Sequence, residues 1–194
     1  NPVKKPQHTI TPLKIKGQII RLIYISRICR HKNLIIILES LMCISKNIKV
    51  DLDIYGFIEE KSYWNKCKNL ISMFPKNINA KYCGLVSTED SQKIISKYHF
   101  LILMTKGENF GHVIYESLSV GRPVIISNRT PWDKLEKKNL GYCLSINKDI
   151  IMKTLEDISK IDNKTFDMMC NRSIEFSRKY FDEQEYNKKF KLLF

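Results

Sequence analysis

Two glutamates lie eight positions apart in a segment that predicts a strand, a turn and a helix. An apolar run ends at Thr105, Glu108 follows in the predicted turn, and Glu116 lies on the predicted helix 110–120. The start of that helix directs free backbone N–H groups and a positive dipole end at the sheet edge, which suits a phosphate. The two carboxylates can hydrogen-bond two hydroxyl-rich parts of one ligand. Each glutamate taken alone also fits an ordinary solvated side chain.

The helical spacing divides this predicted helix into two faces. One face is made of His112, Tyr115, Glu116 and Ser119. The other is made of Val113, Ile114, Ser117 and Leu118. We expect the second face to pack on the core, which leaves Glu116 near the edge where a ligand binds.

Strands and helices alternate along the chain from residue 19 onward. Apolar runs rich in β-branched residues predict strands at 19–27, 50–56, 78–84, 100–105, 123–127 and 141–145. Helical periodicity predicts helices at 31–46, 59–74, 87–97, 110–120 and 132–138, and everywhere after Lys148. Strands joined by helices imply right-handed crossovers and a parallel sheet covered on both faces. The predicted fold class is therefore α/β, a Rossmann-like doubly wound parallel sheet with C-terminal helices.

This pattern predicts three parts of the chain. Residues 1–18 are expected to be a linker, residues 19–165 a Rossmann-like domain, and residues 166–194 a C-terminal helical segment. The first residues are polar and include no Met, so we expect the chain to begin within a longer protein. Ligands of such sheets bind at the carboxyl ends of the strands, near a helix N-terminus.

The glycines and cysteines narrow the possible ligands. No G-x-G-x-x-G follows the first strand, so a nicotinamide or flavin dinucleotide is disfavoured and no cofactor is expected. No two cysteines form the C-x2-C pair of a zinc site, so no metal site is expected either. The six cysteines are expected to be free, mostly buried thiols in a reducing cytosol. They are Cys29, Cys43, Cys67, Cys83, Cys143 and Cys170.

The composition fits a folded domain with an excess of basic charge. Hydrophobic residues make up 43% of the chain, yet no run approaches the roughly 18 apolar residues of a membrane-spanning helix. Lys and Arg outnumber Asp and Glu by 33 to 20, which gives a net charge of +13. This charge would attract an anionic ligand, membrane or nucleic acid, but the basic residues are dispersed as compositional bias would scatter them. A nucleic-acid-binding module therefore remains a weaker alternative.

The segment around the two glutamates resembles a known enzyme family. Three segments resemble one bacterial subgroup of glycosyltransferase family 4. They are residues 107–112 (GENFGH), the E-x-L-x-x-G-x-P-V-I run from Glu116 to Ile125, and Thr130-Pro131-Trp132. That family comprises retaining glycosyltransferases with the GT-B fold and an E-x7-E signature. The resemblance covers roughly residues 19–143. It implies that Glu108 contacts the hydroxyls of the transferred sugar and that Glu116 contacts the ribose.

The resemblance also implies further donor contacts. The backbone amides of Asn109, Phe110 and Gly111 would face the sugar and phosphate, and Arg27 with Lys32 would clamp the diphosphate. Gly56 and Gly84 match family glycines at the ends of the second and third strands. The sequence departs from the family at Ser26, where a glycine is usual, and at Met104-Thr105, where P-S is common. Neither departure removes a charge or a hydrogen-bond donor.

The activity implied is transfer of a sugar from a nucleoside-diphosphate sugar to a glycan or lipid-linked acceptor, in bacterial surface polysaccharide synthesis. The acceptor would bind to a second Rossmann-like domain that precedes this chain, so the chain alone would bind donor weakly and transfer nothing. The expected location is the cytoplasm, with peripheral contact at the inner face of an anionic membrane as a further candidate. An epimerase or a phosphorylase of the same fold is the nearer alternative.

Overall fold

The structure is a computed structural model that describes residues 5–6, 12–132 and 134–191. Its centre is one six-stranded sheet in the order β3-β2-β1-β4-β5-β6, and every neighbouring pair of strands is parallel. The strands are β1 (Ile20–Ile25), β2 (Val50–Tyr55), β3 (Ile78–Tyr82), β4 (Phe100–Leu103), β5 (Val124–Ser127) and β6 (Gly141–Leu144). This order confirms the predicted doubly wound α/β fold.

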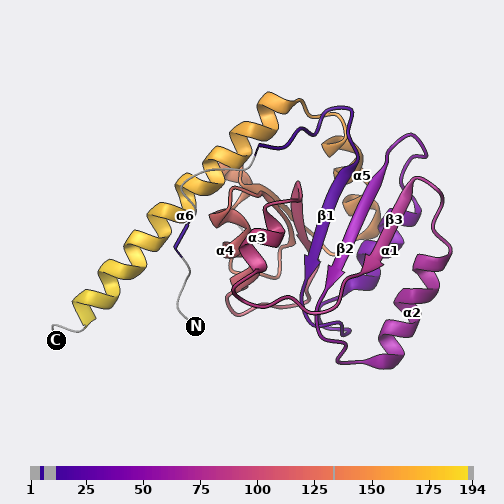
Figure 1. Cartoon of the computed structure of the whole chain (residues 1–194), viewed down its shortest axis with the longest axis horizontal. Helices are drawn as coiled ribbons and strands as arrows, with labels where there is room; N and C mark the ends of the chain where they lie inside the picture. Colours follow the sequence, from indigo (N-terminus) through magenta and orange to yellow (C-terminus); the bar gives the residue numbers. More distant parts are fainter. Residues whose placement is uncertain (1–4, 7–11, 133, 192–194) are drawn as a thin grey trace.

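Helices cover both faces of the sheet (Figure 1). They are α1 (Leu34–Met42), α2 (Lys61–Ser72), α3 (Ser91–Ile95), α4 (His112–Ser119), α5 (Lys148–Ile158) and α6 (Asn163–Lys191), with a short 3-10 helix η1 (Glu136–Lys138). Helix α4 packs against α3 and α6, whereas α1 packs against α2 and α5. The chain winds outward from β1 to β3 and then returns to the centre at β4, so the sheet changes direction between β1 and β4. Ligands of doubly wound sheets bind at this point.

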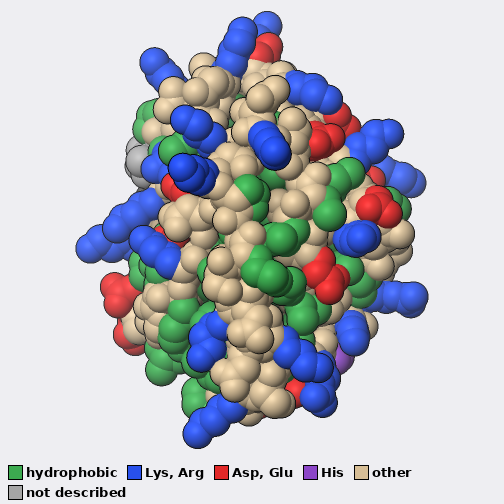
Figure 2. Space-filling model, turned by 90° about the vertical axis from the view of Figure 1, so that its right-hand side faces the viewer, with side chains coloured by type: hydrophobic (Ala, Val, Ile, Leu, Met, Phe, Trp, Pro, Cys, Tyr) green, Lys and Arg blue, Asp and Glu red, His purple; other side chains and the backbone are tan. Residues whose placement is uncertain are grey.

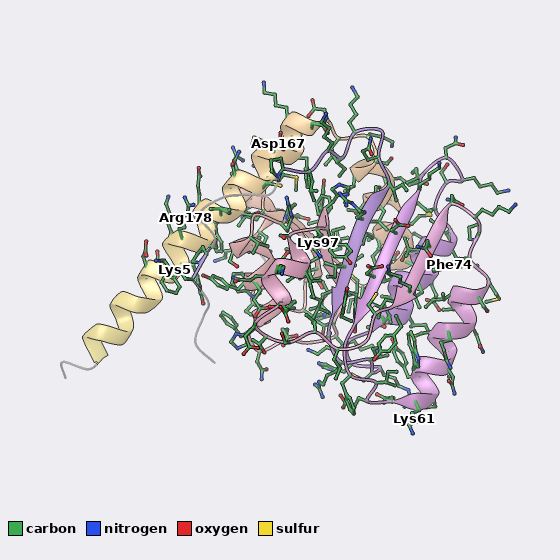
Figure 3. The ribbon with its side chains drawn as sticks, viewed as in Figure 1. Lys5, Lys61, Phe74, Lys97, Asp167 and Arg178 are labelled. Carbon is green, nitrogen blue, oxygen red and sulfur yellow. The ribbon has the colours of Figure 1, made fainter. Side chains whose placement is uncertain are left out.

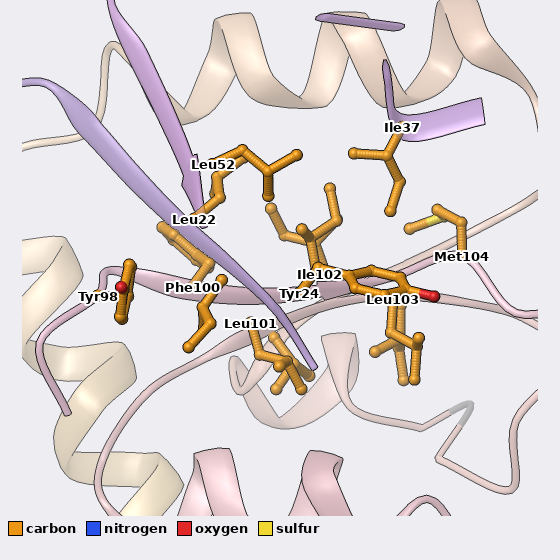
Figure 4. Close-up of a cluster of buried hydrophobic side chains, with 14 of the residues drawn as sticks. Leu22, Tyr24, Ile37, Leu52, Tyr98, Phe100, Leu101, Ile102, Leu103 and Met104 are labelled. Carbon is orange, nitrogen blue, oxygen red and sulfur yellow. The ribbon is translucent and has the colours of Figure 1, made fainter. Parts of the chain in front are cut away.

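The core lies at these central strands, where the close-up shows Leu22 of β1 and Leu52 of β2 beside β4 (Figure 4). All four residues of β4 and of β5 are buried, because strands inside a parallel sheet are covered on both faces. In β1 and β2 four of the six residues are buried, while Arg21, Ile25, Asp51 and Tyr55 remain partly exposed. Apolar burial thus fixes the register of the strands whose ends carry the site.

Two of the predicted helical regions differ in the structure. Residues 132–138 were expected to be helical, but only Glu136–Lys138 forms a 3-10 turn among the residues described there. The region after Lys148 was expected to be helical throughout, but residues 159–162 separate α5 from α6. The Asp162 carboxylate accepts the Thr165 N–H at 2.7 Å and so caps a second helix. Such a cap starts a new helix instead of continuing the old one.

Residues 14–16 contact the start of α6 and the residue before β4. The Asn163 side-chain oxygen accepts the backbone N–H groups of Ile15 and Lys16 at 2.9 and 3.1 Å. The His99 ring accepts the Arg21 N–H at 3.0 Å and lies 3.0 Å from the Lys14 carbonyl. Burial lowers the pKa of His99 to about 4, so the ring is neutral and donates to that carbonyl. These contacts lie away from the carboxyl ends of the strands.

Candidate functional site

Two loops meet at the carboxyl ends of β1 and β4. Residues 26–33 follow β1, and residues 104–111 follow β4. The Lys106 N–H donates to the His31 carbonyl at 2.9 Å, and His31 Nε2 lies 2.9 Å from the Gly107 carbonyl. Because a carbonyl oxygen only accepts, His31 carries a proton on Nε2 in this contact. The loops are therefore held side by side, and groups from both can reach one ligand.

An ion pair joins these loops. Lys32 Nζ lies 2.5 Å from Glu108 Oε2, and the two side chains are only 10% and 19% exposed. The sequence pointed to each residue separately and did not predict that they pair. At such burial both groups depend on each other, because an unpaired charge loses solvation that nothing replaces. The pair places a cation and a carboxylate at one point of the sheet edge.

Gly111 allows Glu108 to lie against the start of α4. Its φ of +77° is left-handed, and a Cβ there would lie 2.8 Å from Ile114 Cδ1 and 3.1 Å from Glu108 Cγ. A larger residue would therefore be strained at this φ and would require the Ile114 and Glu108 side chains to shift. Within the described residues, the N–H groups of Asn109, Phe110 and Gly111 donate to no protein acceptor. They remain available for an electron-rich ligand, as predicted for a helix start.

Arg27 lies further out than Lys32. Its side chain is 57% exposed, and its guanidinium donates to Glu59 Oε2 at 2.7 Å. Glu59 precedes α2 and was not predicted to belong to the site. Tyr24 holds the backbone beneath, since its hydroxyl donates to the Arg27 carbonyl at 3.0 Å. Burial raises the pKa of Tyr24 well above its usual value, so this donor stays protonated at neutral pH.

Gly56 and Gly84 have structural explanations of their own. At Gly56, φ is +143° and a Cβ would lie 1.8 Å from the Ser26 carbonyl oxygen, so the loop after β1 requires a glycine there. The Gly56 N–H donates to the Gly84 carbonyl at 2.9 Å. Gly84, which follows β3, therefore lies one strand further from Lys32 than Gly56, which follows β2. Their role as ligand contacts stays a prediction.

The expected division of α4 into two faces is wrong for two residues. Tyr115 and Ser119 were placed on the ligand side, but they are 1% and 0% exposed. The Tyr115 hydroxyl donates to the Ser177 carbonyl of α6 at 3.3 Å, and Ser119 accepts from Gln92 of α3 at 2.7 Å. The reason is that α4 packs against two helices as well as the sheet.

What remains of the expected ligand face is narrower. His112 is exposed and Glu116 is half-buried, while Val113 on the expected core face is also only half-buried. Glu116 lies one helical turn after His112, in the middle of α4. The role of Glu116 as a ribose contact stays a prediction.

One site residue was quoted in the sequence without a role. The Trp132 indole N–H donates to the Phe110 carbonyl, and Trp132 is 7% exposed. The only signal for it was its place in the Thr130-Pro131-Trp132 match. Because Trp132 lies 22 residues beyond Phe110, its proximity depends on the pairing of β4 with β5.

Metal-ligating side chains do not gather in the part of the chain that the structure describes. Among the described residues, no group of three or more His, Cys, Asp or Glu side chains could hold a metal ion. Asp53 of β2 is occupied by the Tyr98 hydroxyl at 2.5 Å and by Lys81 Nζ at 3.6 Å. No helix in the described parts of the chain combines the length and apolarity of a bilayer crossing.

The six cysteines are free, as expected, but only three are buried. These are Cys29, Cys67 and Cys170. Cys43 caps the end of α1, Cys83 follows β3, and Cys143 lies in the edge strand β6, so the expectation of mostly buried thiols is wrong. Basic side chains are spread over the face shown in Figure 2, with acidic and apolar ones between them. On α6, an acidic and a basic residue, Asp167 and Arg178, are labelled in Figure 3. The face in Figure 2 thus lacks the concentrated basic charge of a nucleic-acid surface.

Solved structures with the same fold are numerous. HepE of Anabaena, in complex with UDP and glucose, matches with a TM-score of 0.74 and 15% identity over 90% of this chain and 48% of its own. The catalytic domain of cholesterol-α-glucosyltransferase of Helicobacter pylori matches with a TM-score of 0.69 and 15% identity over 84% of this chain and 99% of its own. WaaG, a glycosyltransferase involved in lipopolysaccharide biosynthesis, matches with a TM-score of 0.68 and 15% identity over 87% of this chain and 44% of its own.

The chain covers only part of two of these structures. It spans about half the length of HepE and WaaG, and its sheet is a Rossmann-like half of a GT-B fold. No curated protein sequence matches it. The family model described as glycosyl transferases group 1 matches residues 9–172, which is most of the 194 residues. The chain therefore belongs to the glycosyl transferases group 1 family.

Proposed function

We propose that this chain is the donor-binding half of a retaining glycosyltransferase of family 4. The observation that carries the proposal is the Lys32–Glu108 pair, 2.5 Å apart at the point where the sheet changes direction. It lies beside the N–H groups of residues 109–111, for which the described chain offers no acceptor. A nucleoside-diphosphate sugar has both parts that this arrangement suits, an anionic diphosphate and a hydroxyl-rich sugar.

Each side chain then has a distinct role. Lys32 and Arg27 offset the negative charge that develops on the departing diphosphate. Glu108 accepts hydrogen bonds from the sugar hydroxyls, and Glu116 from the ribose hydroxyls. The diphosphate would compete with Glu108 for Lys32, so donor binding would release the carboxylate toward the sugar. The UDP and glucose bound to HepE support this class of ligand.

The complete activity requires a second domain. Since HepE and WaaG are about twice as long as the matched region, we infer that the acceptor binds to another Rossmann-like half. The acceptor would be a glycan or a lipid, in surface polysaccharide synthesis, in the cytoplasm or at the inner membrane face. The cholesterol and lipopolysaccharide enzymes of the same fold support lipid-linked acceptors as a class. Closure of two domains around the donor would exclude water from the reaction.

Calorimetric titration of the 194-residue chain tests the proposal. We expect one of UDP, GDP and ADP to bind, and to bind more tightly than its monophosphate because the second phosphate reaches Lys32 and Arg27. Equal binding of mono- and diphosphate, or binding of neither, would exclude a donor site here. With the longer protein, retention is tested by the anomeric configuration of the product. An epimerase would instead consume its substrate without a glycosyl acceptor, and a phosphorylase would transfer the glycosyl group to inorganic phosphate.

A further inference from the structure

Trp132 bonds to the backbone of the loop that carries Glu108. Its indole N–H donates to the Phe110 carbonyl, and the two rings lie 5.5 Å apart in an edge-on arrangement. The Thr130 hydroxyl accepts the Trp132 backbone N–H at 3.3 Å, which holds the start of this segment. The described part of the chain gives the indole N–H one acceptor, and that acceptor belongs to the peptide between Phe110 and Gly111.

The geometry of that peptide gives the contact a consequence. No peptide bond of the described chain is cis, and in a trans peptide the C=O and N–H point in opposite directions. Since the Phe110 carbonyl points at Trp132, the Gly111 N–H points away from it. Within residues 12–132 and 134–191 that N–H meets no acceptor. The indole therefore fixes the direction of a donor that is free for a ligand.

The indole is itself held by α6. The Trp132 ring lies 5.6 Å from the Tyr180 ring and 6.1 Å from the Phe176 ring. Tyr180 also lies 6.2 Å from the Phe110 ring, so four aromatic side chains form one cluster. A flat bicyclic ring packed on three others has little freedom to rotate. The hydrogen-bond donor at its edge is therefore fixed in direction.

We propose that Trp132 is a positioning residue that aims the Gly111 N–H at the distal phosphate of the donor. This inference rests on the proposed function, since it requires a nucleoside diphosphate at the Glu108 loop. Trp132 touches neither phosphate nor sugar and acts through the Phe110–Gly111 peptide. The role demands an aromatic ring with an N–H at its edge. Phenylalanine has the ring but lacks this donor.

The test uses Trp132→Phe in the 194-residue chain, with Tyr180→Phe as the matched control. The control removes a polar group from the same cluster but leaves the Phe110 carbonyl paired. Calorimetry measures the affinity for the diphosphate that the wild type prefers and for its monophosphate. We expect Trp132→Phe to weaken the diphosphate about fivefold and leave the monophosphate unchanged, since one charged hydrogen bond is misaligned. Tyr180→Phe should bind both ligands as the wild type does.

A second variant separates the N–H from ring packing. Benzothienylalanine introduced at position 132 alone keeps the bicyclic ring and lacks only the donor. We expect it to reproduce the selective loss, which settles the matter even if Trp132→Phe fails to fold. An unchanged preference for diphosphate in this variant, or an equal loss of both ligands, overturns the positioning role and leaves the proposed function standing. If the wild type itself shows no preference for diphosphate, the proposed function fails and this inference fails with it.

Discussion

Two ion pairs flank the candidate site, and they differ in burial. Lys32 and Glu108 are 10% and 19% exposed at their side chains, whereas Arg27 and Glu59 are 57% and 39% exposed. Both cations were predicted to clamp a diphosphate, so the same role was expected for each. The structure shows that one is fixed between two loops and that the other lies in solvent. Residues with the same predicted role therefore differ in how firmly they are placed.

Burial also determines what each pair contributes. An exposed pair contributes about 0–1 kcal/mol and exchanges partners easily. A partly buried pair leaves an uncompensated charge when one partner is removed, so its loss costs more. Lys32 is thus expected to be the permanent anchor for the diphosphate. Arg27 would act as a mobile arm that leaves Glu59 when a ligand arrives.

Lys32→Ala should cause the greatest loss. We expect the affinity for the preferred nucleoside diphosphate to fall about 10- to 150-fold. This range corresponds to the loss of one hydrogen bond to a charged group, about 1.5–3 kcal/mol. The melting temperature should fall as well, because Glu108 would remain partly buried without its partner. Calorimetry and thermal unfolding measure the two effects.

Lys160→Ala is the matched control for this variant. Lys160 also forms a carboxylate pair, with Asp157 at 3.0 Å, but its side chain is 70% exposed. We expect no change in affinity or melting temperature. If both lysine variants behave alike, the buried position of Lys32 has no functional meaning.

Arg27→Ala should have a smaller and purely functional effect. We expect diphosphate affinity to fall about three- to tenfold, below or near the lower end of the range for charged hydrogen bonds, because the side chain must leave Glu59 first. Stability should not change, since the pair is exposed. Arg30→Ala is the control, because Arg30 is 65% exposed and pairs with Glu60 at 3.4 Å. A loss as large as that of Lys32→Ala would contradict the distinction between anchor and arm.

Glu59→Gln should have the smallest effect and the opposite sign. Removing the charge frees Arg27 from its partner at 2.7 Å, so we expect diphosphate affinity to rise about twofold. Titration at low ionic strength makes the effect easiest to detect, because salt screens exposed charges. Glu60→Gln serves as the control. A decrease in affinity would mean that Glu59 itself holds Arg27 in the binding position.

The sheet could be predicted because its strands are marked by local patterns. The runs at β4 and β5 are apolar throughout, as strands buried on both faces must be, and the alternation with helices implied the parallel order. The turn with Glu108 at the end of β4 followed directly. The break at 159–162 was missed because the start of α6 depends on one capping carboxylate, that of Asp162.

Contacts between distant segments could not be predicted in this way. Tyr115 has the spacing of a surface residue on α4, and only the return of α6 buries it. Glu108 and Lys32 are 76 residues apart, so their pairing follows from the tertiary fold and from no local pattern. The same holds for Trp132 and the Phe110 carbonyl. Long-range partners therefore required the structure, although the residue types were visible in the sequence.

The most direct test of the central claim compares Glu108→Gln and Glu116→Gln on truncated ligands. Calorimetry would measure the preferred nucleoside diphosphate and the matching nucleoside-diphosphate sugar on each variant. We expect Glu116→Gln to weaken both by similar factors, because both contain ribose. Glu108→Gln should leave the free diphosphate nearly unchanged and weaken the sugar donor, with a larger loss of turnover in the longer protein. If both variants bind both ligands like the wild type, the two glutamates do not hold a donor and the proposed function is contradicted.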